Sequence, residues 1–158
     1  MEVGNIVEYI DRQKIICAVV IKIKNQRLRL LSESNKEVNL SAKRLLNQER
    51  TRLDLSIGRD RLVLDLKALA RRRRELIDHV DIRDIWEVLN SEMEWIDLET
   101  MTAFCFPDEP GPDQQSAVMR AIFDDRLYFK FSPGRFFPHS QKQVDQIGAE
   151  RKEEERRL

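Results

Sequence analysis

The hydrophobic pattern of the chain changes its period near Gly58. Before that residue, apolar and polar side chains alternate in short stretches such as Ile21-Lys22-Ile23-Lys24, and a period of two is typical of half-buried strands. After it, apolar residues recur at steps of three and four, which is typical of amphipathic helices. The sequence therefore predicts an α+β protein of more than one domain, with a β-rich part followed by a largely helical part.

The β-rich part is expected in residues 1–47. Runs rich in Val and Ile, separated by polar turn signals, predict four short strands at 5–11, 14–24, 27–32 and 38–40. Short strands at such close spacing favour a small SH3-like β-barrel.

Residues 48–80 are expected to connect this barrel to the rest of the chain, mainly through one amphipathic helix at 59–78. The helix carries four consecutive arginines, residues 71–74. Because four consecutive residues of a helix point to all of its sides, at least one arginine must lie along the packed face. The others fit either a solvated, ion-paired surface or a contact with phosphate groups, and the pattern leaves both open.

Residues 81–139 show the element order of a winged-helix domain. Asp81, Asp97 and Asp113 each precede a stretch of helical periodicity and are expected to be N-caps. A minimal strand at 95–96 precedes the second helix, and the stretches 126–131 and 135–138 predict a β-hairpin around a Ser-Pro-Gly turn. A charged helix in 140–158 then leads toward an expected downstream domain. The predicted fold class is thus an SH3-like barrel followed by a winged helix of the helix-turn-helix type, with extra flanking helices.

Charge is strongly segregated along the chain, although the formal net charge is zero. Residues 1–46 hold nine basic and five acidic side chains, residues 81–125 hold two and twelve, and residues 126–139 hold three and none. Segregation of this kind bears on partners rather than on fold. The two basic stretches can approach a polyanion, whereas the acidic stretch should repel one.

The sequence offers no catalytic constellation, so we expect no catalytic residue, metal or cofactor in this chain. His79 and His139 are isolated, and the five glycines form no phosphate-binding loop. Cys17 and Cys105 lie among apolar residues and are expected to be small buried side chains. The acidic residues Asp108, Glu109, Asp113, Asp124 and Asp125 fit caps, turns and a solvated loop better than a metal site. No apolar run is long enough to cross a membrane and no export signal opens the chain, which favours a cytoplasmic protein.

Two surfaces are candidates for nucleic-acid contact. Basic residues that alternate with apolar ones in the barrel should project from one sheet face, although an ordinary solubilising surface would look the same. The hairpin combines Arg126 and two further cations with Tyr128, Phe129, Phe131 and Phe136, which could stack on a single strand unless they alternate into the core. The predicted binding residues are Lys22, Lys24, Arg27, Arg29, Lys130 and Arg135.

The third predicted helix would be the DNA-reading helix of a winged-helix regulator. Its expected exposed positions are Gln114, Gln115, Ser116, Met119 and Arg120. One arginine among acidic neighbours opposes phosphate attraction, which dominates affinity for DNA. Duplex-DNA binding is therefore the alternative rather than the leading prediction.

Several stretches, in their order along the chain, resemble the N-terminal region of ribonuclease II-like (RNB-family) exoribonucleases. They are Val3-Gly4-Asn5-Ile6-Val7-Glu8-Tyr9, the stretch 82–89 with Trp86, Trp95-Ile96-Asp97-Leu98-Glu99, Leu127-Tyr128-Phe129-Lys130 and Arg135-Phe136-Phe137-Pro138. The resemblance implies that such modules precede a large domain that degrades RNA from the 3′ end with Mg²⁺ held by aspartates. That region is absent here, so no catalytic residue carries over.

The resulting hypothesis is a non-catalytic, RNA-binding and docking region of a hydrolytic 3′-to-5′ exoribonuclease. It predicts weak, salt-sensitive binding of single-stranded RNA. The acidic stretch is expected to dock on the protein's own catalytic domain or on another protein. A winged-helix DNA-binding regulator and a pure protein-interaction module remain the alternatives.

Overall fold

The computed structural model describes residues 1–108 and 110–157, apart from the side chain of residue 48. The chain is α+β and divides into two compact units, residues 1–75 and 76–158. Each unit is described by itself below. Within the described residues, no helix is long and apolar enough to cross a membrane.

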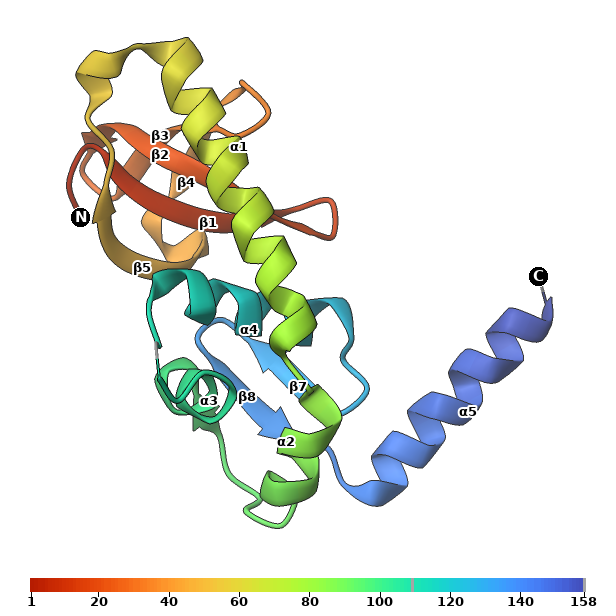
Figure 1. The fold of residues 1–158 in the computed structure, drawn as a ribbon. Helices are drawn as coiled ribbons and strands as arrows, with labels where there is room; N and C mark the ends of the chain where they lie inside the picture. Colours follow the sequence, from red (N-terminus) through yellow and green to blue (C-terminus); the bar gives the residue numbers. More distant parts are fainter. Residues whose placement is uncertain (109, 158) are drawn as a thin grey trace. The chain divides into compact units, whose positions relative to one another are not determined.

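The first unit is built on a five-stranded antiparallel sheet (Figure 1). Its strands are β1 (Asn5–Asp11), β2 (Lys14–Lys24), β3 (Arg27–Ser32), β4 (Glu37–Ser41) and β5 (Leu45–Arg52), in the order β4-β3-β2-β1-β5. A short 3₁₀ turn, η1 (Ala42–Arg44), joins β4 to β5.

The fifth strand was not among the four predicted from the sequence. β5 pairs antiparallel with β1 and runs across residue 47, where the barrel was expected to end. Its sequence, Leu-Leu-Asn-Gln-Glu-Arg-Thr-Arg, has no alternation of apolar and polar residues. This strand forms through backbone hydrogen bonds with β1, and the apolar pattern of the sequence does not predict such pairing.

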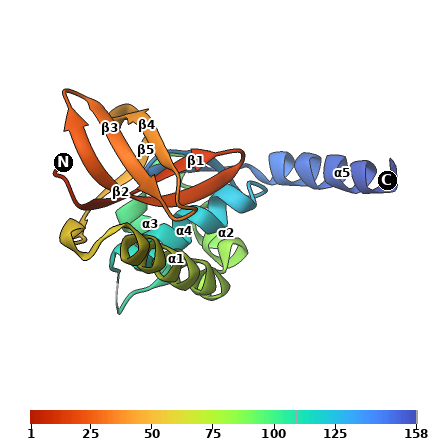
Figure 2. The same cartoon turned by 90° about the horizontal axis from the view of Figure 1, so that it is seen from above.

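The helix α1 (Arg59–Leu76) covers part of one face of the sheet (Figures 1 and 2). It follows the 3₁₀ turn η2 (Leu55–Ile57). One apolar cluster lies on the inner side of the sheet, where Val7, Val20 and Leu30 are fully buried. A second lies on the outer side, where Cys17, Val19, Leu31, Leu62, Val63, Leu66 and Ala70 join strands and helix. The sheet therefore has apolar contacts on both faces, but α1 covers the outer face only in part.

Arg73 of α1 is buried and ion-paired. Its side chain is 1% exposed and lies 3.2 Å from the carboxylate of Glu8 on β1 and 2.9 Å from that of Glu49 on β5. Its guanidinium also lies 3.9 Å from the sulfur of Cys17 on β2. The prediction that one arginine of residues 71–74 packs inward is thus confirmed. Arg71 and Arg74, in contrast, form exposed or partly exposed pairs with acidic residues.

Burial and charge act in opposite directions on this cluster. Burial would lower the pKa of Arg73, but the hydrogen bond to Glu49 and the charges of Glu8 and Glu49 raise it, so the guanidinium stays charged. Burial raises the pKa of Glu49, against the hydrogen bond and charge of Arg73 and with added repulsion from Glu8. Glu49 is therefore a weaker acid than an ordinary glutamate.

The second unit contains four helices longer than one turn and a three-stranded sheet in the order β6-β8-β7, among its described residues. After the 3₁₀ turn η3 (Ile77–His79), its elements are α2 (Ile82–Leu89), β6 (Ile96–Asp97), α3 (Leu98–Cys105), α4 (Pro112–Asp124), β7 (Phe129–Ser132), β8 (Arg135–Pro138) and α5 (Gln141–Arg157).

Two of the three predicted N-caps are confirmed. The Asp81 carboxylate accepts a hydrogen bond from the backbone amide of Asp84 (3.1 Å), and that of Asp97 accepts one from Thr100 (2.7 Å). The third prediction is wrong, because Gly111 is the N-cap of α4 and Asp113 lies in the first turn. Pro112 occupies the first helical position, where the missing N–H costs nothing and the fixed φ suits a helix, so the helix starts two residues earlier than predicted.

The hairpin and Trp86 of α2 contribute to the core of the second unit. Phe129 and Phe136 are fully buried, and the Trp86 indole donates a hydrogen bond to the backbone carbonyl of His139 (2.7 Å). The Trp86 ring also contacts Tyr128, with 5.3 Å between centroids. The charged helix α5 has no buried residue and is linked to the end of α4 by an Arg151–Asp125 ion pair of 2.7 Å.

Replacing Arg73 by alanine should destabilise the first unit by about 3–5 kcal/mol, because Glu8 and Glu49 would remain buried without their cation. Urea unfolding measures this. Arg71→Ala is the matched control, and loss of its exposed pair with Glu75 should cost at most about 0.5 kcal/mol. Arg73→Met in a Glu8→Gln, Glu49→Gln background should cost much less than in the wild type. Equal costs in both backgrounds would show that packing, and not charge pairing, is what Arg73 supplies.

Glu49 should make the stability fall as pH rises. Its folded-state pKa lies above the ordinary value of 4.5, so between these two pKa values the folded chain holds a proton that the unfolded chain has released. The free energy of unfolding of the wild type, relative to that of Glu49→Gln, should therefore decrease as the pH rises through and above the ordinary value of 4.5. Denaturant titrations of both proteins across this range measure the difference. A difference that grows with pH would mean that pairing with Arg73 outweighs burial.

Candidate nucleic-acid interface

The four predicted basic residues of the barrel lie together on one face of the β2–β3 hairpin. In the strand register, Lys22 is opposite Arg29 and Lys24 is opposite Arg27. Residues directly opposite each other in an antiparallel pair point to the same face, and so do residues two apart in one strand. All four side chains are exposed. The expectation that several of these cations share a sheet face is therefore met.

A β-bulge places these cations on the outer face. Val20 is opposite Leu30 but Lys22 is opposite Arg29, so Ile21 is an extra residue without a partner in β3. Without this shift, strict alternation would put Lys22 on the same side as Val20, in the inner apolar cluster. With it, Lys22 and Lys24 continue the outer face begun by Cys17 and Val19, beyond the part that contacts α1.

The electrostatics of this basic face leave most of its charge available. Arg29 lies 3.6 Å from Glu37, which also lies 3.9 Å from Arg59, and these side chains are well exposed. Within the described part of the chain, Lys22, Lys24 and Arg27 form no salt bridge. On the neighbouring strand β4, Asn39 is opposite Arg29 and Ser41 is opposite Arg27. Such a surface of cations and polar groups suits contacts with phosphate and sugar oxygens, which carry no base sequence information.

The two predicted basic residues of the hairpin also point outward. Lys130 is opposite Phe137 and Ser132 is opposite Arg135, so these four residues share the outer face of the β7–β8 pair. Lys130 and Arg135 are exposed.

The aromatic residues of the hairpin that could have stacked on a nucleic acid are buried or packed against other rings of the second unit. Phe129 and Phe136 are buried, Phe131 packs edge-on against Phe123 at 5.2 Å, and Tyr128 contacts Trp86. Arg126 lies over the Phe123 ring at 4.4 Å and donates a hydrogen bond to the Phe123 carbonyl. Within the paired strands, the register places Phe129, Phe131 and Phe136 on the inner face of the hairpin.

Sequence reasoning missed the aromatic residue that does lie among the hairpin cations. Trp95 is 38% exposed, and its ring lies 4.5 Å from the Arg135 guanidinium and 5.9 Å from the Lys130 ammonium. Phe137 meets the same ring edge-on at 5.4 Å. The local sequence did not show this, because the side on which Trp95 lies depends on the pairing of β6 with β8.

The expected DNA-reading side of α4 is not free. Ser116, Met119 and Arg120 were expected to be exposed, but all three are buried, and the Arg120 guanidinium donates to the Ser116 hydroxyl at 3.0 Å. Only Gln114 and Gln115 of the five expected positions are partly exposed. Burial on this helix extends beyond its apolar residues to the polar side chains of Ser116 and Arg120, so the helix has little polar surface to place in a groove.

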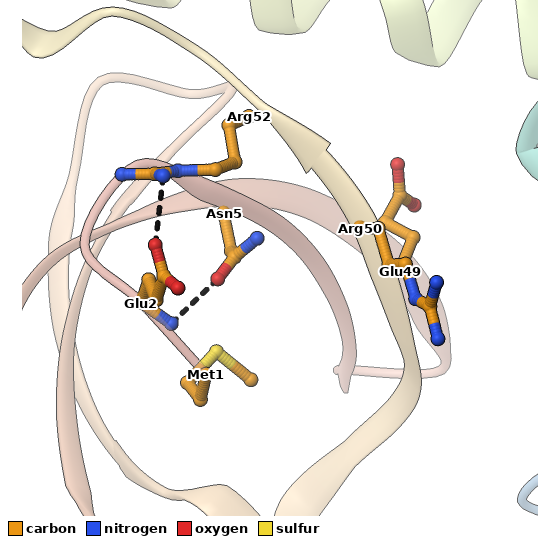
Figure 3. A pocket seen from close by; sticks show the side chains of 6 residues that line it. All are labelled: Met1, Glu2, Asn5, Glu49, Arg50 and Arg52. Carbon is orange, nitrogen blue, oxygen red and sulfur yellow. Dashed lines mark hydrogen bonds and ion pairs between the residues drawn. The ribbon is translucent and has the colours of Figure 1, made fainter.

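A polar cavity of about 580 Å³ lies beside the N-terminus in the first unit (Figure 3). Its lining residues are Met1, Glu2, Asn5, Glu49, Arg50 and Arg52. Arg52 forms a 2.7 Å ion pair with Glu2, and the Asn5 side chain accepts a hydrogen bond from the Glu2 amide (Figure 3). These contacts hold the N-terminal segment against β5, so they account for the polar residues without a ligand.

A second cavity, of about 560 Å³, brings together two residue types that catalysis often uses. His79 and Cys105 both line it, with apolar neighbours that include Phe106. Burial raises the pKa of Cys105 to about 11, so at neutral pH its thiol is protonated and a poor nucleophile. The arrangement does not supply an activated thiolate.

The acidic residues considered as metal ligands are engaged in other contacts. Asp125 forms an ion pair with Arg151 and accepts a hydrogen bond from the Leu127 amide. Partial burial raises the pKa of Asp124, against the charges of Arg120 and Arg126. Across residues 1–108 and 110–157, no group of three or more His, Cys, Asp or Glu side chains could hold a metal ion. Glu109 lies outside the described residues.

Comparison with known proteins points to one fold. No protein-family model matches the chain, and no curated protein matches it. Among solved structures, the chain is similar to an active-site mutant of the Dss1 exoribonuclease from Candida glabrata, with a TM-score of 0.68 over 95% of this chain at 9% identity. The chain spans 25% of the length of that protein's chain. At this identity the likeness concerns the fold alone: this chain shares its fold with a segment of an exoribonuclease.

Proposed function

We propose that this chain is a non-catalytic, RNA-binding and docking region of a hydrolytic 3′-to-5′ exoribonuclease of the ribonuclease II type. The observation that carries the proposal is the basic face of Lys22, Lys24, Arg27 and Arg29, defined by the register of β2 and β3. Two further findings support it. The sequence resembles RNB-family proteins, and the fold resembles part of an exoribonuclease.

We assign the two units to known architectures on their element order. Five short antiparallel strands, with the last paired to the first, support an SH3-like barrel that runs past residue 47 to the end of β5. Helix, short strand, two helices and a hairpin support a winged helix over residues 81–139. In this assignment α1 connects the two and α5 flanks the second. Catalysis, with the Mg²⁺ that it requires, belongs to a different region of the parent protein.

The basic face binds RNA through its backbone. Four exposed cations attract phosphates, and the released counterions make the binding depend on salt. Because few cations take part, the affinity is weak at physiological salt. This suits a surface that captures or guides a strand for another domain.

Charge reversal on the basic face tests the proposal. Lys22→Glu/Lys24→Glu should lower the affinity for a labelled single-stranded RNA about tenfold or more at low salt. If each lysine contacts one phosphate, the slope of log affinity against log salt should shrink by about 1.4. Fluorescence anisotropy across a salt series measures both quantities.

The matched control for charge is Lys142→Glu/Lys152→Glu, which reverses the same number of exposed lysines on α5. It should leave the affinity close to that of the wild type. Equal losses for the two double variants would mean that only net charge matters. If Lys22→Glu/Lys24→Glu binds RNA as tightly as the wild type, the basic face does not bind RNA and the proposal is contradicted.

We also propose that the acidic part of the second unit docks on a basic surface of the parent protein's catalytic domain. Glu87, Glu92 and Glu94 are exposed around α2 and the loop that follows it. Two apolar side chains lie exposed among them, Val88 at 64% and Met93 at 73%. Acidic residues that surround exposed apolar groups disfavour contacts with RNA phosphates and suit a protein interface with a complementary charge.

Docking predicts that Met93 becomes protected in the parent protein. Hydroxyl-radical footprinting should show slower oxidation of Met93 in the full-length protein than in the 158-residue chain. Leu64 on α1, which is similarly exposed at 61%, is the internal control and should react equally in both. Equal oxidation of Met93 in both proteins would contradict docking on the catalytic domain. If Met93 is protected only after another protein is added, that protein and not the catalytic domain is the docking partner.

A further inference from the structure

We infer that Trp95 is a stacking site for one unpaired base of single-stranded RNA, flanked by Arg135 and Lys130. This inference rests on the proposed function and assigns a second, chemically different contact to it. The basic face of the barrel binds the backbone, whereas the hairpin site binds a base. The site consists of Trp95, Lys130, Arg135 and Phe137 and is called the tryptophan site below.

The tryptophan site is a held aromatic surface rather than a loosely exposed side chain. Phe137 meets the Trp95 ring edge-on, with 5.4 Å between centroids and a 70° angle between planes. The Arg135 guanidinium lies 4.5 Å from the ring centroid, within the range of a cation–π contact. Two strands of the sheet carry these partners, since Arg135 and Phe137 are in β8 and Lys130 is in β7. The ring orientation is therefore set before any ligand binds.

The two tryptophans of the chain differ in what they do. Trp86 is 6% exposed, and its indole N–H is used by the His139 carbonyl, as is usual for a core tryptophan. Trp95 keeps 38% of its surface exposed, next to two cations. Base stacking on an aromatic ring or on an arginine plane is the common way in which proteins bind unstacked bases. An exposed indole with an arginine over it provides both surfaces.

Local charge favours a base over the phosphate backbone at this site. Glu92 and Glu94 are exposed just before Trp95, and Asp97 is opposite Arg135 in the sheet register. The Asp97 carboxylate is occupied as the N-cap of α3, but its charge remains. With acids this close, Lys130 and Arg135 cannot form a long track of phosphate contacts. Stacking is little affected by nearby charge, so it should account for most of the affinity here.

Trp95→Ala tests the inference, because stacking and phosphate contacts respond differently to salt. The variant should bind single-stranded RNA about tenfold more weakly than the wild type, by a factor that stays constant across a salt series. Trp95→Phe keeps a smaller ring and should recover part of this loss. Phe104→Ala is the matched control, since Phe104 is an aromatic residue with 52% exposure in the same unit, and it should bind like the wild type.

A strand without bases separates stacking from charge. The wild type should bind oligouridine more tightly than an abasic strand of equal length, and Trp95→Ala should bind the two alike. Lys22→Glu/Lys24→Glu should weaken both. In a Trp86→Phe background, where Trp95 is the remaining tryptophan, oligouridine should quench the fluorescence and the abasic strand should not.

The outcomes distinguish this inference from the proposed function. If the barrel variant loses affinity while Trp95→Ala binds like the wild type, the tryptophan site is wrong and the proposed function stands. The inference also fails if Trp95→Phe is as weak as Trp95→Ala, or if Trp95→Ala weakens binding to the abasic strand equally. If the wild type binds no single-stranded RNA, the proposed function fails and the tryptophan site fails with it.

Discussion

The ion-paired cluster around Arg73 is the interaction on which the first unit depends. One buried guanidinium on α1 joins Glu8 on β1 to Glu49 on β5 and also lies near Cys17 on β2. Burying three charged groups is costly unless each is paired, so this cluster tolerates few arrangements of helix and strands. It places the C-terminal half of α1 over β1 and β5. The apolar pattern did not predict the pairing of β5 with β1. This pairing is consistent with the ion pair, which requires Glu49 of β5 to lie near Arg73.

The same arrangement leaves the candidate interface open. Because α1 packs on Cys17, Val19 and Leu31, the outer face of the β2–β3 hairpin is covered at one end only. The bulge at Ile21 then brings Lys22 and Lys24 onto the uncovered end. One end of this sheet face is thus buried because α1 covers it. The other end is exposed and carries Lys22 and Lys24 because β2 has one extra residue, Ile21. The hairpin of the second unit divides its faces in a similar way, with Phe129 and Phe136 inside and cations outside.

Much of the candidate site could be predicted from the sequence where local rules apply. Alternation identified the basic residues of β2, β3 and the hairpin, and acidic residues before helical stretches identified the caps Asp81 and Asp97. Prediction failed where contacts between residues far apart in the chain decide which side chains are buried and which are exposed. The face of Trp95 depends on its pairing partner, and the burial of Met119 and Arg120 depends on what packs against α4. Neither can be read from neighbouring residues, because tertiary packing overrides local pattern.

By itself, the sequence determined the change from strands to helices near Gly58, the segregation of charge, and the need for one arginine of residues 71–74 to pack inward. These are local properties, because periodicity, charge and helical geometry act over a few residues. Only the tertiary structure decided which arginine that is, where β5 pairs, and which aromatic ring meets the hairpin cations. Each of these depends on groups far apart in the chain that meet only when the strands take their register.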